Sequence, residues 1–239
     1  MNPMPFDRML SYCADLRDHN EREWFHANHR RYEEARKDFL SLLDQLRYAI
    51  AEASPEIGGD ILYMDARDWV YRIARDMRFY NNVPPYNPSF RAYISADRKS
   101  WLPIGYFLCV EPGATIFGTG LFLEETAEVN RVRDYIAVHQ LEWEAILEGG
   151  QLTLEGDTLK TIPRGYAPDH PAAKWLRYKN WLVTQHFPDG ALGSFDDFAA
   201  AIGALVPRME PFRKFLLAAA LSAEAPKPIL PAGEKDWGW

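Results

Sequence analysis

The sequence has few cysteines, no excess of positive charge and no long apolar run. There are two cysteines in 239 residues, too few for a disulfide framework, so Cys13 and Cys109 are both expected to be reduced and buried in apolar segments. The formal net charge is −7, which argues against bulk nucleic-acid binding because that needs a basic surface. No apolar stretch is long enough to span a bilayer, the longest helical one being Phe215–Leu221, so no membrane partner is expected.

Signals for export, cofactors and metals are also missing. The N-terminus lacks the positive region and apolar run of a signal peptide, so a reducing cytoplasm is the expected compartment. There is no nucleophile elbow, Walker loop or complete dinucleotide fingerprint, so no cofactor is predicted. Gly118 and Gly120 indicate a bulge or a close approach of a ligand or another backbone. His26, His29 and Glu33 share a helix face, but no further ligands accompany them, and no metal site is predicted.

Apolar residues at helical spacing dominate the N-terminal part of the chain. They predict a helix over about Phe6–Leu16 and a longer second helix whose buried stripe runs from Phe25 to Ile50. Asn20, with Glu23 three residues later, resembles a capping box that would begin the second helix. Breakers at residues 54–59 are expected to end the helical region.

The central part of the chain alternates apolar and polar residues, as strands do. Strands are expected at Trp69–Ala74, Phe90–Ser95, Gly105–Glu111 and Thr115–Phe122. The Pro112-Gly113 turn between the last two predicts that they are neighbours in an antiparallel hairpin.

Helical patterns return after the strands. Helical structure is expected to resume at Thr126 and to extend up to Gly149-Gly150, followed by a short β segment within Gln151–Lys160. A helix is expected after Pro168–Pro171 that includes Trp175, Leu176, Leu182 and Val183. Ser194 with Asp197 is expected to open a last helix, which Pro207 and Pro211 break or kink. This order predicts an α+β fold with an antiparallel sheet packed against N-terminal and C-terminal helices. We expect a single domain over residues 1–224 and a Pro-rich tail over 225–239. The oligomeric state stays open.

Four segments together resemble one family: Asn20–Tyr32, Tyr71–Tyr86, Gly105–Phe122 and Leu159–Lys179. They carry N-x-R-E-W-F, R-D-x-R-F and P-x-G-Y-x-x-x-H-P, and in combination they are similar to DUF2461, a family of conserved hypothetical proteins. The resemblance extends from about Phe6 to Leu217. It implies one α+β domain and no known substrate.

One departure from the family pattern concerns the turn after R-D-x-R-F. Asn81, Val83 and Asn87 stand where the resemblance implies lysines. If those lysines bind an anion in relatives, this protein is expected to bind it more weakly or to bind something else, through its arginines and Tyr86.

The first charged cluster is Arg72, Arg75, Asp76 and Arg78, at the end of the predicted strand. One interpretation is a structural network in which a buried Arg75 pairs with Glu111 or Asp76, because a buried arginine needs a partner. The other is an anion site, since the planar guanidinium fork suits carboxylate and phosphate. Arg72 and Arg78 suit the second interpretation better, because they lie on the opposite face of the strand.

The second cluster is Arg164, Tyr166, His170, Lys174 and Lys179. His170 precedes a predicted helix, whose N-terminus favours anions. It is the candidate proton-transfer residue if the protein is an enzyme. Its alternative role is to cap the helix or fix the loop through local hydrogen bonds.

Together these clusters predict one positively charged pocket for a small phosphorylated or carboxylated ligand. Its predicted ligand-binding residues are Arg72, Arg78, Tyr86, Arg164 and Tyr166, with His170 as the catalytic candidate. The alternative is a non-catalytic interaction protein whose arginine network only holds the fold.

Overall fold

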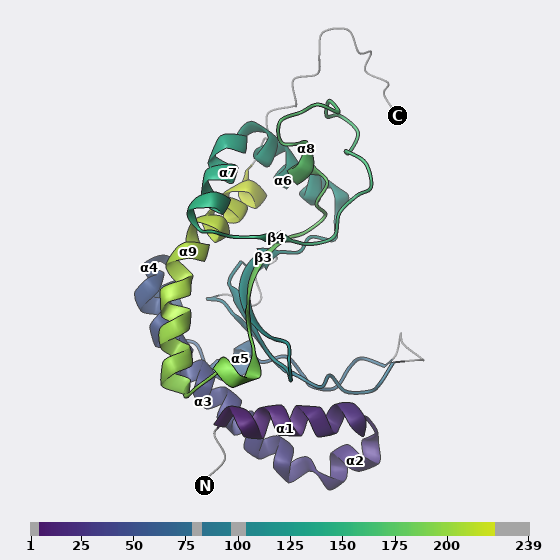
Figure 1. Cartoon of the computed structure of the whole chain (residues 1–239), viewed down its shortest axis with the longest axis vertical. Coiled ribbons are helices and arrows are strands. Elements are labelled where there is room, and N and C mark those ends of the chain that lie inside the picture. The colour runs from purple at the N-terminus through teal and green to yellow at the C-terminus, as the bar shows by residue number, and fades with distance from the viewer. Residues whose placement is uncertain (1–4, 78–82, 97–103, 223–239) are drawn as a thin grey trace. The chain divides into compact units, whose positions relative to one another are not determined.

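The computed structural model describes residues 5–77, 83–96 and 104–222 (Figure 1). The helices are α1 (Pro5–Asp18), α2 (Arg22–Ala27), α3 (His29–Ala53), α4 (Pro55–Ile61), α5 (Ala66–Trp69), α6 (Thr126–Val138), α7 (Gln140–Gly149), α8 (Ala173–Leu176) and α9 (Phe195–Leu221). The strands are β1 (Phe90–Ile94), β2 (Tyr106–Val110), β3 (Thr115–Leu121), β4 (Leu154–Glu155) and β5 (Trp181–Phe187). None of the described helices is both long and apolar enough to cross a membrane. The α+β class is confirmed.

Within the described residues the strands form one antiparallel sheet in the order β1-β2-β3-β5-β4. The predicted hairpin of β2 and β3 is confirmed. Its turn is closed by Ala114, whose N–H donates to the Glu111 carbonyl at 3.0 Å. Gly113 has φ of 75°, a left-handed conformation that glycine adopts without steric cost. Gly120 marks a close backbone approach, because a Cβ there would lie 2.4 Å from the Trp181 carbonyl oxygen.

The chain divides into two compact units, Met1–Gly118 with Thr184–Pro207 and Thr119–Val183 with Arg208–Trp239. The single domain expected over residues 1–224 stays a prediction, and the tail over 225–239 lies outside the described residues.

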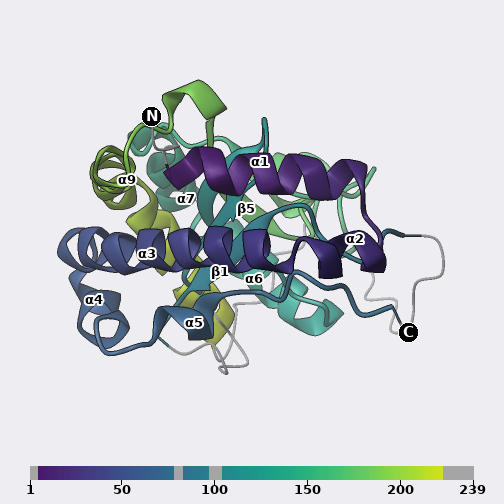
Figure 2. The ribbon, with the colours of Figure 1, turned by 90° about the horizontal axis from the view of Figure 1, so that it is seen from below.

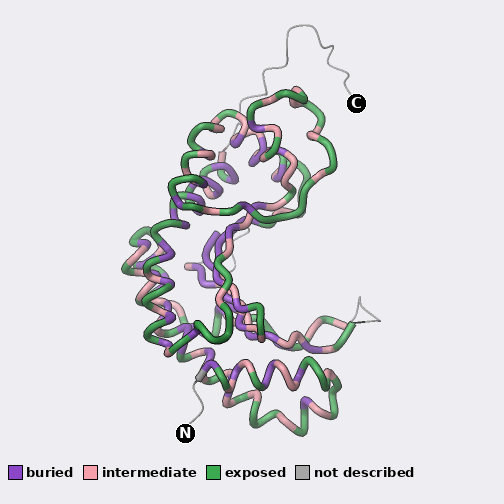
Figure 3. Tube along the Cα trace, in the orientation of Figure 1, coloured by how far each residue is buried: buried purple, intermediate pink, exposed green. Residues whose placement is uncertain are grey.

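In the first unit α1 packs on α3, and α3 and α5 contact β1 (Figure 2). Buried and exposed positions alternate along these helices, as Figure 3 shows. The buried stripes predicted from helical spacing supply the core, which includes Met9, Cys13, Leu16, Phe39, Leu42, Leu46, Ile50, Phe90 and Ile94.

The second unit is built around buried aromatic residues. The Trp143 ring on α7 lies 5.3 Å from Phe212 and 5.0 Å from Phe215, both on α9. Trp181 on β5 is also fully buried. Such rings contribute most of the apolar area in a small core.

The N-terminal helices differ from expectation at three places. The long second helix is interrupted at Asn28, between α2 and α3. Gly58 lies within α4, so residues 54–59 do not end the helical region. Asn20 is not the N-cap of α2; that position is Glu21, which makes no side-chain capping bond.

The predicted strand Trp69–Ala74 is wrong as a regular strand. Trp69 ends α5, and the following residues are extended backbone with isolated bridges at Val70 and Ala74. Trp69 and Ile73 are buried, whereas Tyr71 is exposed. The Asp65 side chain caps α5 by accepting the Arg67 N–H at 2.9 Å, a local signal that competes with strand formation.

Two C-terminal expectations are also corrected. The helix after Pro168–Pro171 ends at Leu176, and Leu182 and Val183 belong to the strand β5. The run W-L-V-T-Q-H-F is rich in β-branched and aromatic residues, which favours a strand. The α9 helix runs through Pro207 and Pro211 without the expected break, and a kink there stays a prediction. Its predicted start is confirmed, because Ser194 Oγ donates to Asp197 Oδ2 at 2.7 Å and accepts the Asp197 N–H at 3.1 Å.

Both cysteines are free thiols. Cys13 is fully buried, and burial raises the pKa of its thiol. Cys109 is only half-buried, which corrects the expectation that both are buried. In β2 the inward residues are Tyr106, Leu108 and Val110, so Cys109 lies on the other face of the sheet.

Candidate functional site

The candidate site is built on two extended segments, residues 70–75 and 85–92. They run antiparallel, with bridges that pair Val70 with Ala92 and Ala74 with Tyr86. The pairing register shifts by two residues between the bridges, next to Pro88, which has no N–H to donate. The backbone hydrogen bonds that join the segments run from Tyr71 N–H to the Arg91 carbonyl (2.9 Å), from Asn87 N–H to Ile73 (2.8 Å) and from Arg75 N–H to Pro85 (2.8 Å).

An open cavity of about 690 Å³ lies beside these segments. Its lining residues are Tyr71, Arg72, Ala74, Arg75, Asp76, Val83, Asn87 and Arg91. Three of them are arginines, from two different segments, on a chain whose net charge is −7. The lining also contains one carboxylate, that of Asp76, so its guanidinium groups outnumber its carboxylates.

Arg75 is half-buried, whereas the sequence predicted a buried residue. Its Nε donates to Asn87 Oδ1 at 2.7 Å, and Nη1 donates to the Pro84 carbonyl at 3.3 Å. These contacts join the two extended segments at Arg75. The predicted ion pair of Arg75 with Glu111 or Asp76 stays a prediction. Asp76 is exposed and lines the cavity, and the Glu111 carboxylate lies 3.9 Å from the Cys109 thiol.

Arg91 was not predicted from the sequence as a site residue. Its guanidinium lies 5.6 Å from the centroid of the Tyr71 ring, a cation–π geometry. The alternation of β1 carried a signal, because Arg91 occupies an outward position in the strand Phe-Arg-Ala-Tyr-Ile. The alternation alone does not show that Tyr71 lies beside Arg91, which depends on the pairing of the two segments.

Tyr86 is absent from the lining of this cavity, and its role as a ligand-binding residue stays a prediction. Its side chain is buried, and its ring stacks on Phe25 with centroids 4.2 Å apart. Its backbone is bound by the Asn20 carboxamide, which donates from Nδ2 to the Tyr86 carbonyl at 3.0 Å and accepts the Tyr86 N–H at 2.9 Å. Tyr86 thus anchors the two-stranded ribbon that is formed by residues 70–75 and 85–92. Arg78 lies outside the described residues.

The second cluster belongs to the second unit and is tied to α6. Tyr166 donates its hydroxyl hydrogen bond to Asp134, and burial together with this bond raises the pKa of the Tyr166 phenol. Arg133 beside it donates to the Tyr178 carbonyl at 2.9 Å, and burial lowers the pKa of its guanidinium. Tyr166 therefore has a structural partner. Arg164 is exposed and makes no ion pair within the described residues.

His170 already has a local role. Its Nδ1 accepts the Ala172 N–H at 3.0 Å, so any proton of the neutral ring is on Nε2. This is the loop-fixing arrangement considered as the alternative to catalysis. Its role as a proton-transfer group stays a prediction, as does the single pocket shared by the two clusters, because the cavity lining comes entirely from the first unit.

Lysines of the second cluster occupy ordinary surface positions. Lys174 lies 4.2 Å from the centroid of the Trp175 ring and 3.8 Å from the Glu144 carboxylate. Glu144 also accepts from Trp175 Nε1 at 3.2 Å, the main reason that its pKa is lowered. Lys179 is exposed. Across the described residues, no group of three or more His, Cys, Asp and Glu side chains is arranged to hold a metal ion.

Comparison with known proteins gives a family and no activity. The model of a family described as "Conserved hypothetical protein (DUF2461)" matches residues 8–215. The chain belongs to the DUF2461 family. No curated protein and no solved structure matches it. The DUF2461 match covers both charged clusters and confirms the family inferred from the four sequence segments.

Two of the positions at which this chain departs from the DUF2461 pattern lie in the cavity lining. Val83 and Asn87, where the resemblance implies lysines, both line the cavity. Asn87 accepts the Arg75 hydrogen bond, which a lysine cannot do because it has no acceptor atom. Asn81 lies outside the described residues. The positive charge of this cavity consequently comes from its arginines.

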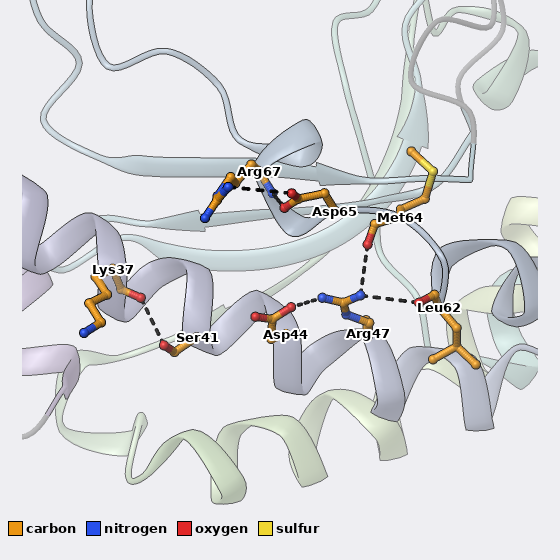
Figure 4. Close-up of polar contacts among 8 residues, drawn as sticks. All are labelled: Lys37, Ser41, Asp44, Arg47, Leu62, Met64, Asp65 and Arg67. Carbon is orange, nitrogen blue, oxygen red and sulfur yellow. Dashed lines mark hydrogen bonds and ion pairs between the residues drawn. The ribbon is translucent and has the colours of Figure 1, made fainter.

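Arg47 shows how this DUF2461 chain uses an arginine structurally (Figure 4). It donates from Nη1 to the carbonyls of Leu62 at 3.4 Å and Met64 at 2.9 Å, and it pairs with Asp44. The side chain is only 16% exposed. Arg47 thereby ties α3 to the connection between α4 and α5, and its guanidinium is largely occupied by the fold.

Proposed function

We propose that this DUF2461 protein binds a small carboxylated or phosphorylated ligand in the cavity lined by Arg72, Arg75 and Arg91. The observation that carries the proposal is the convergence of these arginines on one cavity. On an acidic chain, an isolated cationic side chain can reach solvent anywhere on the surface. The gathering of several cationic side chains in one cavity therefore favours a negatively charged partner. Guanidinium groups bind carboxylate and phosphate through paired N–H donors.

The contacts of the arginines leave donors for a ligand. Arg75 uses Nε and Nη1 for Asn87 and Pro84, and its Nη2 has no partner among the described residues. Arg91 lies over the Tyr71 ring and makes no ion pair in the described part of the chain. Arg72 is exposed and likewise unpaired there. The fold thus orients these side chains without consuming their charge, in contrast to Arg47.

The proposal is for binding, in a reducing cytoplasm that suits two free thiols. It includes no proton transfer at His170, whose Nδ1 is engaged by Ala172. Neither nucleic acid nor membrane is part of it, since the cationic surface is one local cavity on an acidic chain.

Thermal shift against citrate, inorganic phosphate and nucleoside monophosphates tests the proposal, because a ligand that binds only the native state raises Tm. Citrate or phosphate should raise Tm in the wild type, and Arg91→Met should remove most of that shift. Arg30→Met is the matched control, because it removes the same charge from an exposed arginine on α3 that pairs with Glu34. The proposal fails if no anion shifts Tm, or if both variants lose the shift equally.

A further inference from the structure

The ribbon beside the cavity has an unpaired backbone edge. In the bridge between Ala74 and Tyr86, the hydrogen bonds are made by the flanking residues, from Arg75 to Pro85 and from Asn87 to Ile73. In this kind of antiparallel pair the N–H and C=O of the two bridged residues point outward, away from each other. Ala74 and Tyr86 therefore present their backbone groups on opposite edges of the ribbon.

The fold satisfies one of these edges and leaves the other open. At Tyr86 the Asn20 carboxamide supplies one donor and one acceptor, which is what a neighbouring strand would supply. At Ala74, and at Arg72 with the same parity, no hydrogen bond reaches the backbone within the part of the chain that the structure describes. Both residues are exposed and both line the cavity. An open edge of this kind is a template for another strand.

We propose that the Arg72–Ala74 edge accepts an extended acidic peptide segment as an added antiparallel strand. This inference rests on the proposed function, because the peptide's carboxylates would be the anions bound by the arginines. Backbone hydrogen bonds to Arg72 and Ala74 give the peptide its orientation, and alternate side chains give it specificity.

Charge selects an acidic peptide over a second copy of this chain. Two copies paired through Arg72–Ala74 would bring the same cations together, and like charges across neighbouring strands are destabilising. Arg75 lines the cavity together with Tyr71 and Arg91, whose guanidinium lies 5.6 Å from the centroid of the Tyr71 ring. A peptide with a glutamate at every second position directs all its carboxylates to one face, where they meet this arginine-lined cavity.

The probe is a fluorescein-labelled, seven-residue peptide with Thr at each end and with Val and Glu alternating between them. Both termini are capped. Fluorescence anisotropy should show saturable binding that weakens with salt. Replacing Glu by Lys in the peptide should weaken binding at least tenfold. N-methylation of the Glu residues and N-methylation of the Val residues test the strand geometry separately, because the two sets of N–H groups point to opposite edges. One set should weaken binding at least tenfold and the other should change it little.

Ala74→Pro is the matched protein variant. Proline removes the outward N–H of Ala74. It breaks none of the ribbon's hydrogen bonds, because the Ala74 N–H makes none of them, and proline is tolerated on strand edges. It should weaken peptide binding at least tenfold, whereas Ala74→Ser, which keeps the backbone N–H, should weaken it much less. The N-methylated peptides provide the same test on unaltered protein if the proline variant does not fold.

The outcomes separate the two proposals. Citrate binding without peptide binding, or equal losses from both N-methylated sets, overturns the strand addition and leaves the anion cavity standing. Absence of any Arg91-dependent anion shift overturns the proposed function. A wild-type dimer in sedimentation velocity that Ala74→Pro converts to monomer overturns the peptide in favour of a second copy.

Discussion

The carboxamide of Asn20 binds the backbone of Tyr86 with both of its polar atoms, although the residues are 66 positions apart in the chain. The bonds are 3.0 Å and 2.9 Å long. They fasten the connection between α1 and α2 to the ribbon that carries the cavity. Phe25 completes the joint by stacking on the Tyr86 ring.

Asn20→Ala should destabilise the protein by about 2–3 kcal/mol, because it removes both bonds and leaves a part-buried N–H and C=O unsatisfied. Urea titration of the purified variant measures the loss. Asn20→Asp keeps the acceptor but places a carboxylate oxygen against the Tyr86 carbonyl, so it should also destabilise the protein. A change below about 0.5 kcal/mol in Asn20→Ala, typical of surface sites, would mean that water replaces the carboxamide without cost.

Arg47→Met should be more destabilising than Arg75→Met. Arg47 is largely buried and bonds two carbonyls and Asp44, so a loss of about 2–4 kcal/mol is expected. Arg75 is half-buried and bonds Asn87 and Pro84, so a loss of about 1 kcal/mol is expected. Parallel urea titrations give the order. A larger loss for Arg75 would support the buried ion pair that the sequence suggested.

Tyr12→Phe should leave stability unchanged or raise it by about 1 kcal/mol. The Tyr12 hydroxyl is buried and has no hydrogen-bond partner among the described residues, and burial raises the pKa of the phenol. Removing an unsatisfied buried polar group recovers its desolvation cost. Thermal unfolding of the variant checks this, and a clear drop in Tm would reveal a partner for the hydroxyl.

Tyr166→Phe should act in the opposite direction, with a loss of about 1.5–3 kcal/mol, because the hydroxyl donates to a carboxylate. The pKa of Tyr166 is raised in the folded protein, chiefly by burial and then by the Asp134 bond. The folded state therefore holds the phenol proton more tightly, so this contribution is full below about pH 10 and declines as the pH rises beyond it. Urea titrations at pH 8 and pH 11 should show the difference between wild type and variant shrinking at the higher pH.

The thiols should differ in reactivity. Cys13 is fully buried and Cys109 half-buried, and burial raises both pKa values, which lowers the thiolate fraction at neutral pH. A disulfide reagent at pH 8 should label Cys109 slowly and Cys13 more slowly still. Cys109→Ser should therefore abolish the faster phase. Preferential labelling of Cys13 would contradict the burial of α1.

The local patterns of the sequence predicted elements whose hydrophobic period was long or whose turn was specific. The α1 and α3 stripes, the hairpin at Gly113 and the start of α9 at Ser194 follow from interactions within a few residues. The errors arose where two local preferences competed. Trp69 lies where a capped helical turn meets an extended run. Leu182 lies in a short apolar run whose pattern suits both a helix and a strand, so the segments that pair with it decide which one forms.

The sequence by itself determined the α+β class, the family, and the presence of excess arginine near residues 72–78. Tertiary structure decided which cations share a cavity. Arg91 joins Arg72 in the cavity lining because a bridge pairs Val70 with Ala92, whereas the Tyr86 ring stacks on Phe25 and is absent from that lining. The open edge at Ala74 was likewise invisible in the sequence. Backbone hydrogen bonds are made by every residue type, so only the pairing of distant segments decides which backbone groups are left unpaired.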